Sequence, residues 1–352
     1  MKRISLFLFL FICNALATSA AEFLSITGVV SDAQGKPLVA ATVFIDGSKK
    51  ITATNELGQF RFTELNPGTY KVVVNMVGYH SVKQTVNLEK TSKALMITLK
   101  VKEFALKEVV IKSNSERAAF LELFTSNFLG NTENAVACEI LNTEILDFVN
   151  DKKTGLLEAT SDDFLIIINK NLGFRIKYLL RAFRYNRQTR VASYDGEVIF
   201  EQLEGSASAE TQWLVNRRKA YLGSLMHYLR TVYHNNSREE GFITYDQNGA
   251  GLKLKYVEEA VSRIDSNFVS LHYINPIYVR YDKENALKAY QPSGQRPAKS
   301  IVTGGSTLKL YLSEAVLDQK GSYVDYKSFF IQGYWGSRRI GDQLPFEYIL
   351  PD

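Results

Sequence analysis

ITGVVSDAQGKPLVAATVFIDGSKKITATNELGQFRFTELNPGTYKVVVNMVGY, residues 26–79, is the stretch that decides the fold of the first part of the chain. β-forming residues alternate in it with polar ones, and short turns interrupt them near Gly35, at Asn55 to Gly58 and at Pro67-Gly68. Alternation with a period of two is typical of strands with one buried face, and Gly, Pro and Asn supply the backbone angles of tight turns. With two further β-rich runs, at residues 81–88 and 94–99, the pattern predicts about seven short strands, as in a β-sandwich.

The turn and core positions of this stretch resemble those of the carboxypeptidase regulatory-like domain over roughly residues 24–100. The matching residues are Gly28, Asp32, Gly35, Pro37, Leu38, Ala41, Val43, Thr52, Thr54, Gly58, Phe60, Phe62, Leu65, Pro67, Gly68, Tyr70, Gly78 and Tyr79. Asn55 stands where the family usually has Asp. The resemblance implies a transthyretin-like Greek-key sandwich, common at the front of outer-membrane receptors and other envelope proteins of Gram-negative bacteria. Because the matching positions are structural, it implies no peptidase activity.

The composition suggests two domains. The chain has 352 residues, 45% of them apolar, and a typical domain has about 100–200 residues. The formal net charge is +5, from 42 Lys and Arg against 37 Asp and Glu. This excess of positive charge is too weak to indicate nucleic acid as a partner.

We expect residues 1–21 to be a secretory signal peptide, because Lys2-Arg3 precedes an apolar run that ends in small residues up to Ala20-Ala21. The protein is therefore expected to be exported, to the periplasm or in association with the outer membrane. After cleavage Cys138 would be the only cysteine, which excludes an intramolecular disulfide, and its apolar neighbours predict a buried strand position. No later run is long and apolar enough to predict a transmembrane helix.

We predict the sandwich over residues 22–100, a linker over residues 101–115 and an α+β domain with an antiparallel sheet over residues 116–352. Residues 103–111 of the linker are similar to the segment that follows this module in TonB-dependent receptors and that in some of them engages TonB. A last strand or connector that packs on the sandwich is the favoured alternative. The remaining chain is too short for a receptor barrel, which needs about 22 strands.

The second domain is expected to open with an amphipathic helix, because Phe120, Phe124 and Phe128 recur every four residues before Gly130. An antiparallel meander follows, with strands at residues 135–140, 145–148, 156–160, 164–168 and 173–185. Tyr194-Asp195-Gly196-Glu197 reads as a hairpin turn. Further strands are expected at residues 242–245, 252–257, 268–273, 277–281, 308–312 and 328–332.

Residues 210–233 predict the longest helix. Its apolar stripe contains Arg218. Three roles are open for this charged side chain: it forms a structural ion pair, it snorkels to solvent, or it binds an anionic ligand. His227 and His234 are expected on the opposite, solvated face. Residues 120–352 resemble a region that recurs behind this sandwich in Gram-negative envelope proteins and has no assigned activity. The resemblance is carried by residues 128–132, by residues 213–230 and by Leu344-Pro345.

The sequence carries no recognisable motif for catalysis or for metal or cofactor binding. The four histidines do not occur in spacings that place two zinc ligands together. There is no Gly-x-Ser-x-Gly motif and no complete dinucleotide-binding glycine loop. The acidic pairs Asp162-Asp163 and Glu258-Glu259 read as solvated faces, not as glycosidase carboxylates. We therefore predict no catalytic residue, no metal and no cofactor.

The aromatic residues provide the remaining functional hint. Tyr334 and Trp335 lie beside Arg338 and Arg339 in the sequence, an arrangement that could stack a sugar or bind a peptide carboxylate. Packing of the aromatic residues in the core is the alternative. With Arg218, these residues are the candidate binding residues.

Three functions are compatible with these features. The leading hypothesis is a non-catalytic binding or scaffolding protein of the cell envelope that contacts a protein partner or a glycan. One alternative is a hydrolase whose site is assembled from distant residues of the C-terminal domain. The other is an accessory component of TonB-linked nutrient uptake, suggested by residues 106–111.

Overall fold

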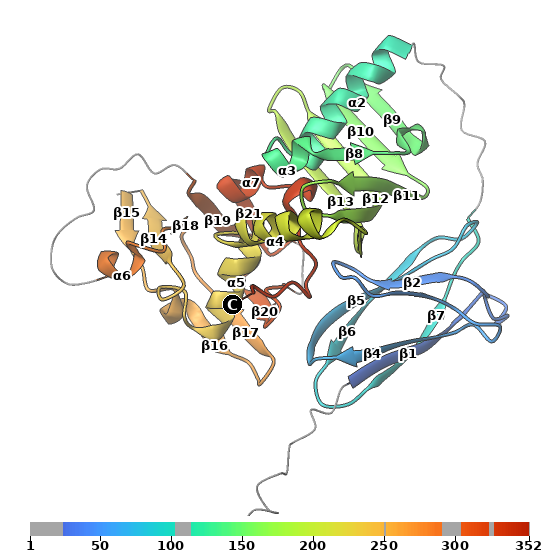
Figure 1. The fold of residues 1–352 in the computed structure, drawn as a ribbon, viewed down its shortest axis with the longest axis horizontal. Coiled ribbons are helices and arrows are strands. Elements are labelled where there is room, and N and C mark those ends of the chain that lie inside the picture. The colour runs from blue at the N-terminus through green and yellow to red at the C-terminus, as the bar shows by residue number, and fades with distance from the viewer. Residues whose placement is uncertain (1–23, 103–113, 250, 291–303, 324–326, 352) are drawn as a thin grey trace, which may run out of the picture.

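The computed structural model describes residues 24–102, 114–249, 251–290, 304–323 and 327–351. They form three units, which we call the sandwich (residues 24–102), the central unit (residues 114–221) and the C-terminal unit (residues 225–338) (Figure 1). The predicted signal peptide and residues 103–111, the segment with similarity to TonB-dependent receptors, lie outside the described residues.

The sandwich consists of two sheets with the strand orders β4-β1-β7 and β3-β2-β5-β6. Its strands are β1 (Leu24–Ser31), β2 (Thr42–Ile45), β3 (Ile51–Ala53), β4 (Gln59–Leu65), β5 (Gly68–Asn75), β6 (Val82–Leu88) and β7 (Lys93–Thr98). Neighbouring strands are antiparallel except β1 and β7, which run parallel. The predicted β-sandwich is confirmed.

Local sequence explains these strands well. Phe60 and Phe62 alternate with exposed residues in β4 and point into the core between the sheets. The turn before β4 is closed by Asn55, whose Oδ1 accepts hydrogen bonds from the backbone N–H groups of Leu57 at 3.0 Å and Gln59 at 2.8 Å. A side chain that closes its own turn in this way fixes the register of the strands on both sides.

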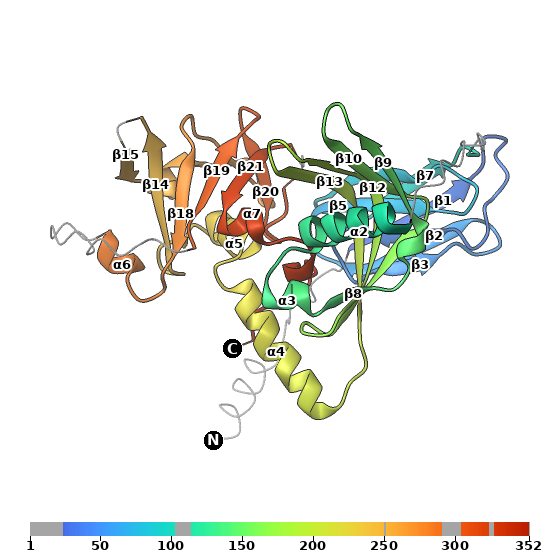
Figure 2. The same cartoon turned by 90° about the horizontal axis from the view of Figure 1, so that it is seen from above.

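The central unit is built on a six-stranded antiparallel sheet around the long strand β12. Its strands are β8 (Cys138–Ile140), β9 (Leu146–Asp151), β10 (Leu156–Ser161), β11 (Phe164–Asn169), β12 (Phe174–Asn186) and β13 (Val191–Gln202), and its helices are α2 (Asn114–Leu129), α3 (Glu133–Val136), the 3₁₀ turn η2 (Thr143–Ile145) and α4 (Ala207–Tyr221). Helix α2 lies across one face of the sheet (Figure 2). Phe120, Phe124 and Phe128 are buried in this contact, so the predicted amphipathic helix is confirmed.

Two predictions for the central unit are wrong. The predicted strand at residues 135–140 begins with the short helix α3, which Thr132 caps by accepting a hydrogen bond from Ala135 N–H. The predicted hairpin turn at residues 194–197 lies inside β13, and the chain turns back at residues 187–190 instead. Gly196 serves close packing there, because a Cβ atom on it would lie 2.4 Å from the Tyr178 ring.

The C-terminal unit contains two antiparallel sheets, with the strand orders β15-β14-β18-β19-β21 and β16-β17-β20. Its elements are α5 (Leu225–His234), β14 (Phe242–Asn248), β15 (Gly251–Leu254), η3 (Val257–Ala260), β16 (Val261–Arg263), β17 (Phe268–Leu271), β18 (Ile277–Tyr281), α6 (Ala286–Ala289), β19 (Ser306–Leu310), β20 (Ala315–Asp318), β21 (Phe329–Gly333) and α7 (Tyr334–Ser337). Tyr228, Leu229 and Val232 of α5 are buried against these sheets. Helices together with antiparallel sheets confirm the predicted α+β class.

The predicted single helix over residues 210–233 is two helices, α4 and α5, that meet at a sharp break. Gly223 adopts a positive φ of 73°, and Ser224 caps α5 by accepting a hydrogen bond from the backbone N–H of His227. A left-handed glycine followed by a capping serine ends one helix and starts the next. The change of direction alters which side chains become buried, with consequences for Arg218 and His227 described below.

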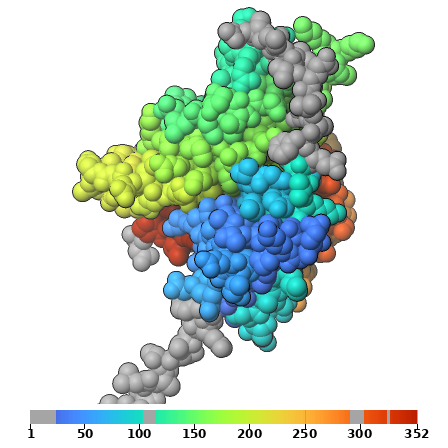
Figure 3. Space-filling model, turned by 90° about the vertical axis from the view of Figure 1, so that its right-hand side faces the viewer, coloured from blue at the N-terminus to red at the C-terminus, as the bar shows by residue number. Residues whose placement is uncertain are grey.

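The end of the chain returns to the central unit. The turn η4 (Ile340–Asp342) follows α7, and Ile340, Leu344 and Tyr348 pack into the core formed by α2 and the central sheet. The sandwich in turn lies directly against the strands of the central unit, as the blue and green surfaces of Figure 3 show. No helix among the described residues has the length and apolar character that crossing a membrane requires.

Candidate functional site

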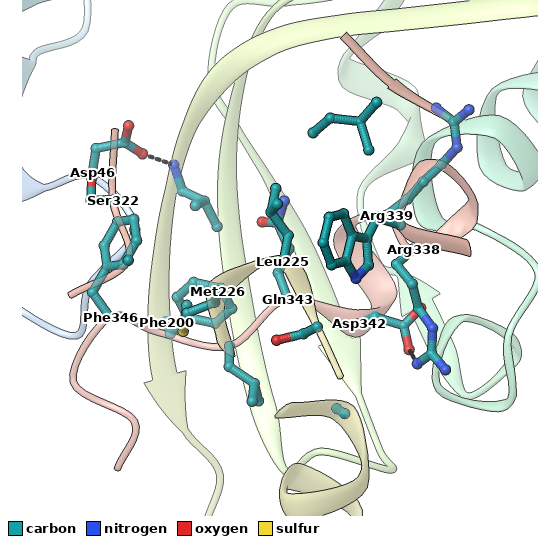
Figure 4. Close-up of a pocket in the computed structure, with 18 of the residues that line it drawn as sticks. Asp46, Phe200, Leu225, Met226, Ser322, Arg338, Arg339, Asp342, Gln343 and Phe346 are labelled. Atoms are coloured by element: carbon teal, nitrogen blue, oxygen red, sulfur yellow. Dashed lines mark hydrogen bonds and ion pairs between the residues drawn. The ribbon is translucent and has the colours of Figure 1, made fainter. Parts of the chain in front are cut away.

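A cavity of about 420 Å³ lies where the three units meet. Its wall includes Asp46, Gly47 and Lys71 from the sandwich; Tyr178, Tyr194 and Phe200 from the central sheet; Tyr323, Tyr334 and Trp335 from the C-terminal unit; and Arg338, Arg339, Asp342 and Phe346 from the following segment. Figure 4 shows Asp46 on one side of the cavity and both arginines on the other. The volume falls within the range of small-ligand sites, about 300–1,000 Å³.

The turn between β2 and β3 forms the junction that closes this cavity. Gly47 N–H donates to the Val198 carbonyl at 2.8 Å, and the Gly47 carbonyl accepts from Phe346 N–H at 2.8 Å. Phe200 N–H donates to the Ser48 carbonyl at 2.9 Å, which extends the contact along β13. A Cβ atom on Gly47 would lie 2.2 Å from the Phe346 ring, and the φ of Gly47 is +75°. Both observations require glycine at this position.

A buried ion-pair group also joins the sandwich to the central unit. The Glu197 carboxylate, which is fully buried, accepts two hydrogen bonds from Arg181 Nε, at 2.7 and 2.8 Å, and pairs with Lys83 Nζ of β6 at 2.8 Å. The single Glu197 carboxylate contacts two cations, each of which is still 31% exposed to solvent, and its removal would leave both without this partner.

A second set of contacts joins the sandwich to the C-terminal unit. Asp318 Oδ2 accepts from Thr69 N–H at 3.2 Å, and Lys320 Nζ pairs with Asp318 at 3.2 Å and donates to the Thr69 carbonyl at 2.8 Å. Lys320 Nζ also lies 3.7 Å from the centre of the Tyr70 ring. The contacts at Gly47, Glu197 and Asp318 therefore join the sandwich to both other units, and the cavity wall is defined by the packing of the three units.

Asp46 contributes a carboxyl group with unusual acid–base properties to the cavity. Its Oδ1 accepts a hydrogen bond from Val198 N–H at 2.8 Å. Burial raises the pKa of Asp46 from its ordinary value of 3.8 to about 6, with the nearby Glu197 adding to the increase, although the Val198 hydrogen bond and Lys71 oppose it. A largely desolvated carboxyl group that forms no ion pair behaves in this way, because desolvation disfavours its charged form.

Arg338 is held by the protein itself. Its Nη1 pairs with Asp342 Oδ1 at 2.8 Å, and its Nη2 donates to the Tyr334 hydroxyl. Asp342 accepts further hydrogen bonds from Thr132 Oγ1 at 2.8 Å and Asn134 Nδ2 at 2.9 Å. Arg338 and Asp342 therefore fix the segment after α7 against α3, and neither has a free charge to offer a ligand.

The structure brings four of the five predicted binding residues into the cavity wall, but in different roles. Trp335 is only 6% exposed, packs on Tyr228 with the ring centres 5.2 Å apart, and donates from Nε1 to the Gly223 carbonyl at 2.8 Å. Its indole thus forms part of the core behind the wall and is not a free stacking platform. Arg339 lines the cavity, and its guanidinium carbon lies 5.9 Å from the centre of the Tyr194 ring.

Arg218 lies outside the cavity and outside the core. Its side chain is exposed and donates to the Pro351 carbonyl at 3.1 Å, so the prediction that it lies in the buried stripe of the helix is wrong. The buried arginine is its neighbour Arg217, which donates to the Leu172 carbonyl at 2.7 Å and lies 4.1 Å from the centre of the Phe174 ring. The phase of the helix was misjudged because α4 and α5 were read as one element.

The prediction of a solvated His227 is also wrong. The ring is 3% exposed, its Nδ1 accepts from Gly223 N–H at 3.1 Å, and it packs against Phe242 and Tyr281. Burial lowers the pKa of His227 to about 4, so the ring is neutral at neutral pH. His234 is exposed, as predicted.

The described residues hold no group of three or more His, Cys, Asp or Glu side chains that could bind a metal ion. Cys138 lies half-buried at the start of β8, donates to the Asn134 carbonyl at 3.2 Å, and burial raises the pKa of its thiol to about 12. A thiol with so high a pKa is a poor nucleophile. The two carboxylates of the cavity wall, Asp46 and Asp342, lie on opposite sides of it (Figure 4), and protein donors occupy both oxygens of Asp342.

A second hollow of about 470 Å³ lies on the open face of the larger C-terminal sheet. It is lined by Gln247, Asn248, Pro276, Thr307, Lys309, Tyr311, Phe330 and Gln332. This hollow belongs to one sheet alone. The cavity at the junction draws on all three units, and it alone contains predicted binding residues.

Sequence reasoning missed Asp46, Tyr178 and Tyr194 as residues of the site. Asp46 follows β2 directly and precedes Gly47, which gives it the character of an ordinary turn residue. Tyr178 and Tyr194 belong to strands with alternating aromatic residues and read as core. Only the packing of the sandwich on β13 brings these three residues to one cavity, and no local sequence pattern predicts this packing.

Residues 26–111 match the family model of the CarboxypepD_reg-like domain. None of the curated proteins compared with the chain matches it. Among solved structures, a streptococcal ancillary pilin is 12% identical over 23% of this chain, with a TM-score of 0.21, and a catechol 1,2-dioxygenase from Acinetobacter radioresistens is 10% identical over 29%, with a TM-score of 0.22. The chain covers 33% and 59% of these two proteins. Domains of the matched family occur in extracellular and envelope proteins, and a non-catalytic envelope or scaffolding role is compatible with the match.

Proposed function

We propose that this protein, whose residues 26–111 match the CarboxypepD_reg-like domain, is an exported, non-catalytic binding protein of the cell envelope. Residues 1–21 direct export and are removed. The mature protein resides in the periplasm or at the outer membrane, where the cavity between its units holds part of a glycan or of a protein partner.

The observation that carries this proposal is the composition of the cavity wall. The wall combines aromatic rings with hydroxyl, amide and guanidinium groups, a mixture typical of binding sites that recognise polar ligands through stacking and hydrogen bonds. The three units are joined by hydrogen bonds and ion pairs around the cavity, which keeps its wall pre-formed. A pre-formed wall reduces the entropy cost of binding.

The same geometry does not favour a hydrolase active site in this cavity. A glycosidase needs two carboxyl groups that face each other across the scissile bond. Asp46 and Asp342 lie on opposite sides of the cavity, but Asp342 is engaged by Thr132, Asn134 and Arg338 and is therefore not available as a second catalytic carboxyl group. The role of Asp342 is to hold the wall in place.

Filling the cavity tests the proposal. Leu225, at the start of α5, lines the cavity, whereas Leu214 of α4 is 50% exposed and does not line it. Leu225→Trp should therefore abolish saturable retention of an envelope protein or glycan from envelope extracts, and Leu214→Trp should not. Circular dichroism and thermal unfolding would verify that both variants fold. Turnover of a peptide or glycan by the purified protein, or unchanged retention by a folded Leu225→Trp variant, would contradict the proposal.

A further inference from the structure

One end of the cavity presents hydrogen-bond donors for which the protein supplies no acceptor. Arg339 lines this end, and no carboxylate of the described residues forms an ion pair with its guanidinium group. Figure 4 shows the Arg339 and Arg338 side chains extending in opposite directions, with only Arg338 directed at Asp342. A cation in the wall of a partly enclosed cavity is costly to desolvate unless an anion compensates it.

The Tyr194 hydroxyl accompanies Arg339, whose guanidinium carbon lies 5.9 Å from the centre of the Tyr194 ring. Tyr178 and Tyr194 line the cavity with their ring centres 6.4 Å apart, and neither hydroxyl forms a hydrogen bond with another residue in the described part of the chain. Burial raises the pKa of Tyr194 to about 12 and the pKa of Tyr178 as well, so both hydroxyls keep their protons at neutral pH. The Tyr194 hydroxyl is therefore a donor beside the guanidinium group, whereas the charges that act on Tyr178 are those of Asp46, Asp195 and Glu197.

The acidic groups of the cavity do not satisfy Arg339 and the Tyr194 hydroxyl. Asp342 is occupied by Arg338 and by two further donors, and Asp46 lies on the opposite side of the cavity, where it accepts a hydrogen bond from Val198 N–H. The end at Arg339 thus carries a net positive charge and an excess of donors. An acceptor-rich anion from outside the protein would complete it.

We propose that this end binds the carboxylate of an acidic sugar, such as a hexuronate residue of a glycan, an inference that rests on the proposed function of the cavity. Arg339 forms the ion pair with the carboxylate, and the Tyr194 hydroxyl donates a hydrogen bond to one of its oxygens. The rest of the cavity suits a sugar ring: Tyr334 and Phe346 offer aromatic surface, and the other polar groups of the wall can bond to sugar hydroxyls.

The test compares ligands that differ in one group. Glucuronate and galacturonate carry a carboxylate where glucose and galactose carry a hydroxymethyl group. Binding to the full mature protein is measured by calorimetry, and the wild type is expected to prefer the uronates. Arg339→Gln should weaken uronate binding about tenfold, as the loss of a charge-assisted hydrogen bond implies, while neutral sugars change less than about twofold. Arg218→Gln removes the same charge outside the cavity and should change nothing.

The other outcomes are equally decisive. Equal binding of uronates and neutral sugars, or full binding by a folded Arg339→Gln variant, would overturn the inference and leave the proposed cavity function intact. Binding of a peptide with a free C-terminal carboxylate but not of its amide, with no sugar bound, would assign the site to peptides and overturn the sugar assignment. Absence of binding for all of these probes would also overturn it, while retention in the extract experiment separately decides the proposed function. Tyr194→Phe, which removes one hydroxyl and keeps the ring, should weaken uronate binding about threefold or more.

Discussion

Replacing Asp46 by Asn is expected to stabilise the protein at neutral pH and to leave its stability unchanged in acid. The pKa of Asp46 is about 6 in the folded protein, against an ordinary value of 3.8. The folded state therefore holds the Asp46 proton more tightly than the unfolded state does. Asp46 contributes stability that is fully present below pH 3.8 and is lost as the pH rises through 6.

The magnitude follows from the difference between the two pKa values. About 2 pKa units at about 1.4 kcal/mol each give about 3 kcal/mol as an upper limit for the loss between about pH 4 and pH 7.5. The Asn side chain has nearly the same shape and keeps an oxygen that can accept from Val198 N–H, but it does not titrate. The difference in unfolding free energy between Asp46→Asn and wild type should thus grow from about zero at pH 4 to at most about 3 kcal/mol at pH 7.5.

Urea unfolding of both proteins across this pH range measures the difference directly, since titrations common to both proteins cancel. Glu89→Gln, which removes an exposed carboxylate from the same unit, serves as the control for a change in net charge. A difference that does not vary with pH, or a variant that becomes less stable than wild type as the pH rises, would refute the reasoning. Either result would mean that Asp46 is well solvated or has a cation close by.

Two further predictions concern buried titratable groups. The pKa of His227 is lowered to about 4, so its contribution to stability is present above 6.5 and is lost as the pH falls toward 4. In urea unfolding, the stability advantage of wild type over His227→Asn should shrink over that range, and an advantage independent of pH would contradict this. Glu197→Ala removes a fully buried carboxylate and leaves Arg181 and Lys83, each 31% exposed, without this partner, so it should lower the unfolding free energy by about 1–3 kcal/mol. Lys83→Met should cost clearly less, and equal losses would contradict the prediction.

The sandwich was predictable because its determinants are local. Asn55 closes its turn with its own side chain, and Phe60 and Phe62 alternate with exposed neighbours. The turn and the buried face of the strand are therefore determined by residues of the same short segment. The helix α2 was predictable for the same reason, since its phenylalanines recur at helical spacing. In both cases the buried face is defined by residues close together in the chain.

The errors arose where distant parts of the chain decide the local structure. Asp195-Gly196 has the composition of a hairpin turn, but Gly196 is needed so that the Tyr178 ring can approach β13. The break at Gly223-Ser224 did have a local signal, the pair of a helix-ending glycine and a capping serine, which the long apolar stripe concealed. That oversight placed Arg218 in the core and His227 in solvent, the reverse of their positions.

The candidate site could be predicted only in part, because it is a product of docking. The segment at residues 334–339 was recognised from its own composition. Asp46 enters the cavity because Gly47 bonds to Val198 and Phe346, and Tyr178, which packs on Phe128 of α2, becomes part of the cavity wall because the turn after β2 docks at the edge of β13. A ligand that touches all three units binds their docked arrangement and not the separated units, so it must stabilise that arrangement by a free energy that grows with the logarithm of its concentration relative to its Kd. The contacts at Gly47 and Glu197 and the affinity of the cavity are therefore thermodynamically linked, although neither residue needs to touch the ligand.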